Sequence, residues 1–116
     1  MKRYQGSCHC GGIRFEVSGD LQRVIECNCS ICRRKGAKLW FVPRPQFTLL
    51  SDRQKLATYR FGAERIAHHF CPICGIAPFG EGIDPQGNEI TAVNVRCLDG
   101  VDLDSLPVKH FDGASL

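Results

Sequence analysis

Three cysteines lie within six residues, at positions 27, 29 and 32, in a C-x-C-x-x-C pattern with no fourth ligand close by in the sequence. Cysteine thiolates bind zinc, and a structural zinc site has four protein ligands. A fourth position left open is typical of catalytic zinc, because substrate or water can then reach the metal. Cys27, Cys29 and Cys32, hereafter the cysteine triplet, are therefore the predicted catalytic residues and the predicted ligands of an open zinc ion.

Four further cysteines form two widely separated pairs, Cys8 with Cys10 and Cys71 with Cys74. Each pair supplies half of a tetrahedral site, and together they offer four sulfurs at about 2.3 Å from one zinc ion. A redox-active pair at Cys71 and Cys74 is the alternative, but no long helix follows them. We expect these residues, hereafter the four-cysteine cluster, to bind a structural zinc that ties the N-terminal hairpin to the second half of the chain.

Cys97 is the remaining cysteine, and it leaves two interpretations open. If Cys97 ligates the second metal, both sites are closed and the protein is a non-catalytic structural or protein-interaction module with two zinc ions. If Cys97 stays away, a substrate thiol can bind zinc and lose its proton at neutral pH. We favour the open site, because a free cysteine at the end of a β-branched strand is usually a small core residue. Both interpretations predict two Zn²⁺ per chain.

Charged and titratable residues near the cysteines suggest how a substrate could be held. A basic run follows the cysteine triplet and could receive an anionic substrate, although such a run can also be a solvated loop. It consists of Arg33, Arg34, Lys35 and Lys38. The four histidines are candidate proton carriers, although a single histidine is often structural. They are His9, His68, His69 and His110.

Length and composition favour a single domain spanning residues 1–116, with 43% hydrophobic and 23% charged residues as in soluble globular proteins. No apolar run approaches the roughly 20 residues of a membrane span. The N-terminus has no apolar segment behind its basic residues, so we expect a cytoplasmic protein without a secretory signal. In that reducing compartment, clustered cysteines indicate metal binding rather than disulfides.

The net charge argues against a nucleic-acid partner. The formal charge of +3 counts every cysteine as a neutral thiol. Seven thiolates on two zinc ions would cancel that charge, so no large positive field would attract nucleic acid. The aromatic residues are also not interleaved with the basic run.

Short apolar runs between glycine, proline and turn residues predict an all-β fold with little helix. Two strands should flank residues 8–12 within 4–17, and the others are expected at 24–25, 39–42, 47–50, 56–61, 65–70, 76–79, 89–95 and 108–111. One helical turn is expected at 30–34, and Trp40 is expected in the core. The cysteine triplet then lies where a strand passes into this turn.

Five motifs along nearly the whole chain resemble one known family. They are Gly6-Ser7-Cys8-His9-Cys10-Gly11, Cys27-Asn28-Cys29-Ser30-Ile31-Cys32-Arg33, Tyr59-Arg60-Phe61-Gly62, His69-Phe70-Cys71-Pro72-Ile73-Cys74-Gly75 and the segment from Val93 to Asp102. The chain resembles the glutathione-dependent formaldehyde-activating enzyme and centromere protein V family. Seven cysteines in this order are a highly specific pattern.

The resemblance implies folded, zinc-bound β-sheets of the Mss4-like type. It also implies a structural zinc on the four-cysteine cluster and a catalytic zinc on the cysteine triplet. The implied activity is a carbon-sulfur lyase reaction on the adduct of a small thiol, glutathione, with an aldehyde, formaldehyde. The chain is shorter than the glutathione-dependent enzyme, so peptide-binding segments of the larger members are expected to be absent.

Overall fold

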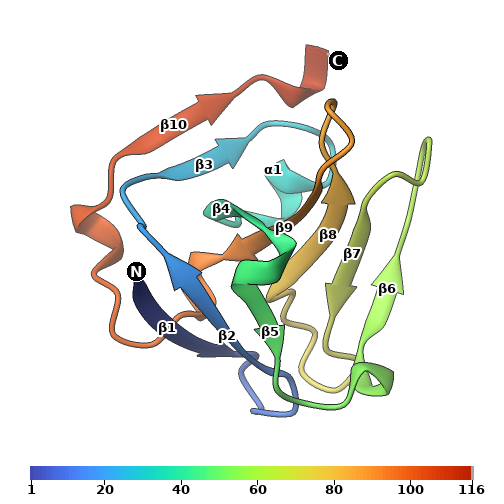
Figure 1. Ribbon diagram of the computed structural model, residues 1–116. Coiled ribbons are helices and arrows are strands. Elements are labelled where there is room, and N and C mark those ends of the chain that lie inside the picture. Colours follow the sequence, from blue (N-terminus) through green and yellow to red (C-terminus); the bar gives the residue numbers. More distant parts are fainter. Residues whose placement is uncertain (116) are drawn as a thin grey trace.

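A computed structural model describes residues 1–115, and its strands form two sheets (Figure 1). The smaller sheet has the order β1-β2-β5, and the larger has the order β10-β3-β4-β9-β8-β7-β6. Neighbouring strands are antiparallel, except that β10 runs parallel to β3. Within residues 1–115 the α-helix is the short α1 (Cys32–Lys35), and no helix there has the length and apolar content to cross a membrane.

The strands lie close to the positions expected from the sequence. They are β1 (Lys2–Ser7), β2 (Arg14–Gly19), β3 (Val24–Cys27), β4 (Leu39–Pro43), β5 (Phe47–Leu49), β6 (Ala57–Tyr59), β7 (Ala67–Phe70), β8 (Phe79–Ile83), β9 (Glu89–Asn94) and β10 (Val108–Phe111). The all-β class and the expected helical turn are therefore confirmed.

One prediction was wrong, because residues 76–78 are not a strand and β8 begins at Phe79. The main-chain N–H of Cys71 donates to the carbonyl of Ile76 at 2.9 Å, which keeps this segment in the turn of the cysteines. β8 itself was missed because Gly80 and Gly82 have low strand propensity. A β-carbon on Gly80 would lie 3.2 Å from the carbonyl oxygen of Ala67, so the backbones of β7 and β8 pack closely here.

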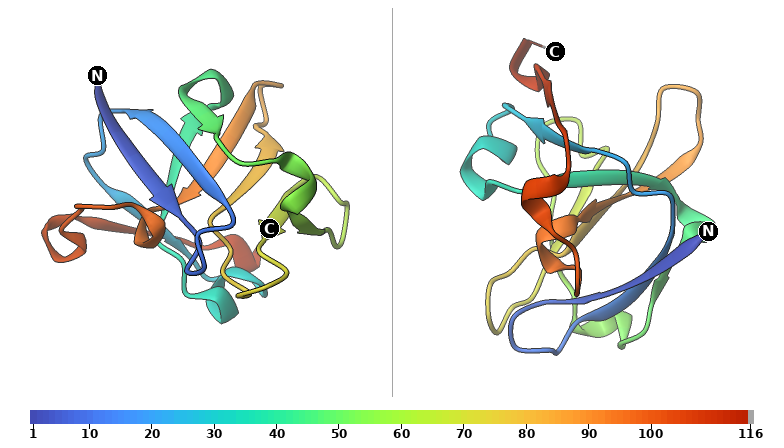
Figure 2. Two further views of the ribbon diagram at one scale, coloured as in Figure 1. Left: turned by 90° about the horizontal axis from the view of Figure 1, so that it is seen from below. Right: turned by 90° about the vertical axis from the view of Figure 1, so that its left-hand side faces the viewer.

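The core lies between the two sheets and is built around three phenylalanine rings. Phe15 of β2 stacks on Phe47 of β5 at 5.1 Å between ring centroids, and Phe47 lies 4.5 Å from Phe79 of β8. In the right-hand view of Figure 2, the β1–β2 hairpin lies on one side of this interior and β4 on the other. Trp40 of β4 is buried with these rings, as expected, and Tyr4 packs edge-on against it.

The other face of the larger sheet is also apolar. Along β4, Trp40 and Val42 are buried in the core, whereas Leu39 and Phe41 point to the opposite side. An antiparallel sheet with one packed face normally carries polar residues on its second face. Here that face presents a series of apolar side chains, namely Ile25, Leu39, Phe41, Ile90 and Ala92, which all line the same pocket.

The close packing of β1 against the core generates a stability prediction. A β-carbon on Gly6 would overlap the ring of Phe15 and would lie 2.8 Å from the carbonyl oxygen of Cys97. Overpacking of this kind costs about 1–3 kcal/mol. We therefore expect Gly6→Ala to lower the free energy of unfolding by about that amount in chemical denaturation. Gln5→Ala, at an exposed neighbouring position, is the control, and equal stability of the two variants would contradict this account.

Candidate metal centre

The four-cysteine cluster has the dimensions of a tetrahedral metal site. The sulfurs of Cys8, Cys10, Cys71 and Cys74 all lie within 4.8 Å of one another. The Cys8 and Cys10 sulfurs are 3.7 Å apart, and those of Cys10 and Cys71 are 3.6 Å apart. Four sulfurs at about 2.3 Å from a zinc ion form a tetrahedron with edges of about 3.8 Å. The donor set and its spacing therefore fit zinc.

Both halves of this cluster have the same backbone frame. The N–H of Cys8 donates to the carbonyl of Ile13 at 3.0 Å, and the N–H of Cys71 donates to the carbonyl of Ile76 at 2.9 Å. Each cysteine thus opens a tight turn that closes five residues later. The turns project two sulfurs each toward one point, from segments that are 61 residues apart.

A glycine with positive φ follows each cysteine pair. Gly11 and Gly75 both have φ of +80°, a conformation that residues with a β-carbon rarely adopt. Within the first turn, the main-chain N–H of Ile13 points at the Cys8 sulfur at 3.3 Å. A thiolate accepts such a bond more strongly than a thiol does, so the turn is arranged for a charged, metal-bound sulfur.

The cysteine triplet lies where β3 passes into α1. Its three sulfurs lie within 4.8 Å of one another and are half-buried. The N–H of Cys29 points at the Cys27 sulfur at 3.4 Å. Burial, together with the neighbouring sulfurs of Cys29 and Cys27, raises the pKa of the Cys32 thiol to about 12. Three thiolates this close repel one another, so a bound cation is needed to keep all of them charged, and this donor set also fits a metal ion.

The C-terminal segment covers one side of the cysteine triplet. Asn28, between two of its cysteines, donates through its side-chain amide to Asp112 at 2.9 Å and accepts from the N–H of Ala114 at 2.9 Å. Gly113 packs so closely that a β-carbon there would lie 2.5 Å from the Cys27 sulfur. The sequence did not indicate these contacts, since a polar residue near the C-terminus carries no metal-binding pattern of its own.

Cys97 lies beside the four-cysteine cluster and not at the cysteine triplet. Its thiol packs against the core, and burial, with Cys8 and Cys74 nearby, raises its pKa to about 11. The group of three sulfurs around Cys29 does not include it. Cys97 thus occupies the small-residue core position that the open-site interpretation expects.

An apolar pocket of about 480 Å³ opens beside the cysteine triplet. All three cysteines line it, and its floor is the apolar second face of the larger sheet. The side walls come from the segment between β6 and β7, from β7 itself, from the α1 turn, from the turn after β8 and from β10. These walls include Phe61, Ile66, Ile31, Lys35, His68, Asp84 and Phe111.

Of the four histidines, only His68 lines this apolar pocket. It stacks on Phe61 with the ring centroids 5.5 Å apart. Burial lowers the pKa of His68 to about 4, helped by Lys35 and then His69, so its imidazole is neutral at neutral pH. His68 can therefore donate a hydrogen bond from one ring nitrogen and accept one at the other.

His69 is buried on the opposite side of β7 and is part of a polar network that reaches the surface. Its Nε2 lies 2.7 Å from the Glu81 carboxylate, and its Nδ1 lies 2.8 Å from the Thr58 hydroxyl. The hydrogen bond from His69, followed by Arg53, holds the pKa of Glu81 at about 2. The sequence did not show which of His68 and His69 faces the pocket. Side-chain alternation along a strand places neighbouring residues on opposite faces but does not identify the functional face.

The remaining two histidines lie away from the apolar pocket. His9 is exposed on the first cysteine turn, within the groove that also contains Cys97. His110 is exposed on β10, with its Nδ1 4.0 Å from the Glu26 carboxylate. Neither lines the pocket next to the cysteine triplet.

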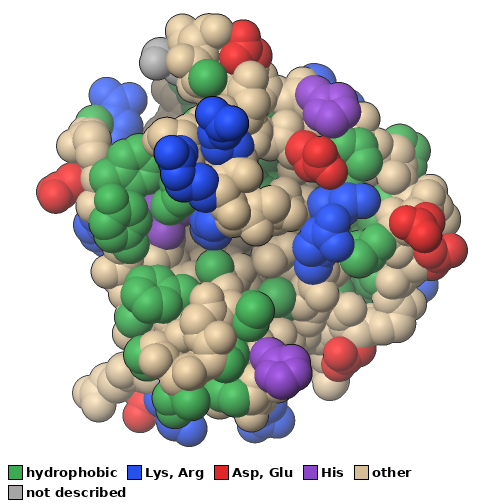
Figure 3. Space-filling view, turned by 180° about the vertical axis from the view of Figure 1, so that it is seen from behind, with side chains coloured by type: hydrophobic (Ala, Val, Ile, Leu, Met, Phe, Trp, Pro, Cys, Tyr) green, Lys and Arg blue, Asp and Glu red, His purple; other side chains and the backbone are tan. Residues whose placement is uncertain are grey.

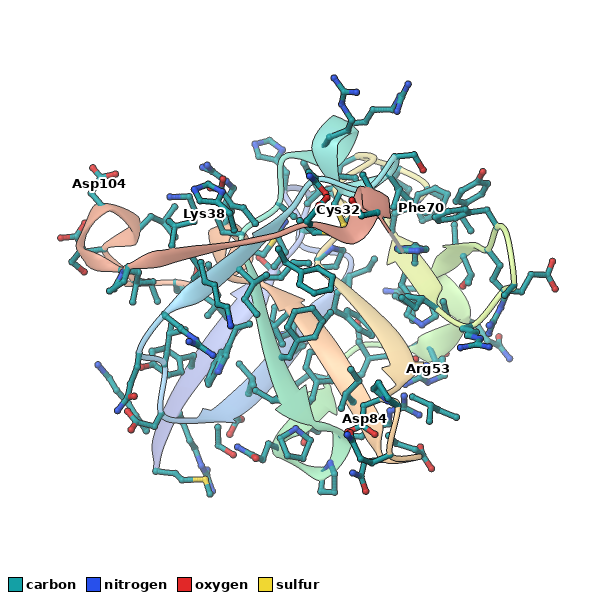
Figure 4. The ribbon with its side chains drawn as sticks, turned by 90° about the horizontal axis from the view of Figure 1, so that it is seen from above. Cys32, Lys38, Arg53, Phe70, Asp84 and Asp104 are labelled. Carbon is teal, nitrogen blue, oxygen red and sulfur yellow. The ribbon has the colours of Figure 1, made fainter. Side chains whose placement is uncertain are left out.

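The basic run divides into three parts. Arg33 and Arg34 are exposed on α1, and the Arg34 guanidinium donates to the carbonyl of Ser30 at 2.7 Å. Lys35 lines the pocket wall, where burial lowers the pKa of its ammonium. Lys38 lies apart from Cys32 (Figure 4) and does not line the pocket. Figure 3 shows hydrophobic side chains gathered on one face of the molecule close to lysine and arginine side chains.

Comparison with known proteins identifies the family. The family model described as glutathione-dependent formaldehyde-activating enzyme matches residues 3–111. A crystal structure of a Rhodobacter sphaeroides protein has a similar fold, with a TM-score of 0.78 and 31% sequence identity, covering 90% of this chain and 99% of that chain. The chain belongs to the family of glutathione-dependent formaldehyde-activating enzymes. The resemblance and the Mss4-like β fold are thereby confirmed.

The two sulfur clusters generate different mutational predictions. Cys71→Ser removes a ligand from the cluster that joins distant segments, so we expect loss of the fold. Cys29→Ser removes a ligand from a local cluster, and we expect a folded protein with one metal ion fewer. Thermal unfolding followed by circular dichroism, combined with zinc analysis, measures both effects. Similar unfolding of the two variants would contradict separate structural and catalytic roles.

The contact between Gly113 and Cys27 generates a further prediction. We expect Gly113→Ala to displace either the C-terminal segment or the Cys27 sulfur, because a β-carbon has no room there. The cysteine triplet should then lose metal to a chelator faster, and its thiols should be alkylated sooner. Ala114→Ser, in the same segment and exposed, keeps the main-chain N–H that Asn28 accepts and is the control. Unchanged alkylation of Cys27 in Gly113→Ala would show that the segment does not protect the site.

Proposed function

We propose that this protein is a zinc-dependent carbon-sulfur lyase acting on the adduct of a small thiol, such as glutathione, with an aldehyde. The observation that carries the proposal is the cysteine triplet, whose three sulfurs line the wall of an apolar pocket. None of the other cysteines among residues 1–115 belongs to this group of sulfurs. Three protein ligands leave one zinc position for a substrate sulfur. The family's description names glutathione and formaldehyde, which supports this reaction class.

Two zinc ions per chain are part of the proposal. Cys8, Cys10, Cys71 and Cys74 would hold the structural ion, and Cys27, Cys29 and Cys32 would hold the open one. When bound, the open ion supplies the acidity that converts a coordinated thiol into a thiolate at neutral pH. We place the protein in the cytoplasm, where reduced thiols are available.

The chain's own residues would then position the aldehyde. The apolar walls exclude water from the reacting atoms, which favours the thiol adduct over the aldehyde hydrate. His68 is neutral and lines the same pocket, so its ring N–H can donate a hydrogen bond to the aldehyde oxygen as that oxygen becomes a hydroxyl. The ammonium of Lys35 offsets the negative charge of the neighbouring sulfurs.

Glutathione itself would lie mostly outside the pocket. Its two carboxylates need cationic partners, and Arg33 and Arg34 are exposed on the adjacent α1. The guanidinium groups of arginine bind carboxylates through paired hydrogen bonds. The peptide can therefore rest along α1 while its sulfur reaches the cysteine triplet.

The second candidate is a non-catalytic module with two structural zinc ions. That function requires a fourth protein ligand at the cysteine triplet, and Cys97 is the one cysteine outside the two clusters. The position of Cys97 beside Cys8 and Cys74 argues against it. The open site is therefore the better supported function.

X-ray absorption at the zinc edge tests the proposal directly. We expect an average of three and a half sulfur ligands per zinc in the purified protein, rising to four when glutathione is added. Nuclear magnetic resonance exchange measurements should show faster formation and cleavage of the glutathione–formaldehyde adduct with the protein than without it. Cys97→Ser should retain both metals and the activity. Four protein sulfurs at both metals before glutathione is added would instead establish the structural module.

A further inference from the structure

We propose that the preferred substrate is the adduct of glutathione with an aldehyde that carries an apolar alkyl or aromatic group, and not the formaldehyde adduct. This inference rests on the proposed function, because it uses the same cysteine triplet as the point where sulfur binds. It goes beyond that function by naming what fills the apolar pocket next to the sulfurs.

The pocket is larger than a formaldehyde adduct requires. The cavity measures about 480 Å³, within the range of pockets that hold whole small molecules. Formaldehyde contributes one carbon and one oxygen to an adduct, which together fill roughly the space of two waters, about 60 Å³. Most of the pocket would then hold water against apolar walls, which is an unfavourable arrangement.

The floor of the pocket is apolar. Ile25, Leu39, Phe41, Ile90 and Ala92 all come from the second face of the larger sheet. No folding requirement makes this face apolar, since the core is already closed by the other face. A continuous apolar surface of this kind is typical of a binding site for an apolar group.

Large apolar side chains at the rim of the pocket are exposed. Phe61 is 40% exposed, Ile66 48% and Phe111 47%, although all three line the pocket next to the cysteines. Leaving large apolar side chains in water costs free energy that a bound apolar group would recover. Phe61 and Ile66 come from the segment between β6 and β7 and Phe111 from β10, so two separate parts of the chain border the opening.

The pocket offers few partners for the polar groups of a ligand. Besides the cysteines, the ionisable groups of the lining are Lys35, His68 and Asp84. Asp84 would repel a carboxylate, and Lys35 already faces the sulfurs of Cys32 and Cys29. The carboxylates of glutathione are therefore better matched by Arg33 and Arg34 outside. This leaves the pocket for the substituent on the aldehyde carbon.

The reaction on such an adduct needs no further reactant. In the forward direction the thiol sulfur bonds to the carbonyl carbon, the carbonyl π electrons move to oxygen, and the thiol proton ends on that oxygen. Cleavage reverses each step and returns thiol and aldehyde. Neither direction changes the oxidation level of the pair taken together, so no oxidant or reductant is involved.

A substrate series tests this inference. Adduct exchange with glutathione should be measured for formaldehyde, butanal and hexanal by nuclear magnetic resonance. Each buried methylene contributes about 0.8 kcal/mol, so kcat/KM should rise about threefold to fourfold per carbon until the pocket is full. Ala92→Leu, which narrows the pocket floor, should abolish most of this gain. Thr48→Leu places the same side chain at an exposed position on β5 of the smaller sheet, away from the pocket. It should leave the rise of kcat/KM with aldehyde length unchanged.

A binding measurement separates this inference from the proposed function. Hexan-1-ol and butan-1-ol contain no sulfur, so their binding does not depend on the lyase reaction. Hexan-1-ol should shift the amide resonances of Gly80 and Ala92, with an affinity about tenfold above that of butan-1-ol. If no adduct is turned over but hexan-1-ol binds in this way, the lyase proposal fails, and what stands of this inference is the preference of the pocket for an apolar group.

Other outcomes would overturn the inference. Turnover of the formaldehyde adduct at or above the rate of the hexanal adduct, with no alcohol binding, would retain the lyase and reject the apolar substrate. Absence of both turnover and alcohol binding would reject both proposals. A dimer in sedimentation analysis that Phe41→Ser converts to a monomer would show that a second copy covers this face, and it would also reject the apolar substrate.

Discussion

The structure depends on bringing two pairs of sulfurs together from distant parts of the chain. The sulfurs of Cys10 and Cys71 lie 3.6 Å apart although 61 residues separate them. Closing such a loop costs conformational entropy, and four unscreened thiolates would repel one another. A metal ion bound by these sulfurs would overcome both costs, since its binding energy becomes available only when all four ligands meet.

This cluster also positions the core of the protein. The turn that begins at Cys8 leads into β2, which carries Phe15, and the turn that begins at Cys71 leads into β8, which carries Phe79. These two rings lie 6.2 Å apart in the core. The smaller sheet is thereby held against one face of the larger sheet, and the opposite face is left free for the pocket.

The two sulfur clusters differ in what surrounds them. The four-cysteine cluster is held between its own two turns, with Cys8 and Cys71 each only 2% exposed and Cys10 exposed. The cysteine triplet is half-buried and borders an apolar pocket, with one side covered by the C-terminal segment through Asn28 and Gly113. Four protein sulfurs suit a metal ion that stabilises the fold, whereas three sulfurs beside a pocket suit one that binds substrate.

The sequence alone determined the sulfur groups and most strands, because ligand spacing and side-chain alternation are local properties of the chain. It did not predict β8, since Gly80 and Gly82 interrupt the strand pattern. It also did not show which of His68 and His69 lines the pocket. Only the tertiary structure decided that Cys97 lies beside Cys8 and that Gly113 packs on Cys27. The apolar pocket was likewise decided by the tertiary structure alone, because its walls come from segments whose proximity depends on strand order and not on local sequence pattern.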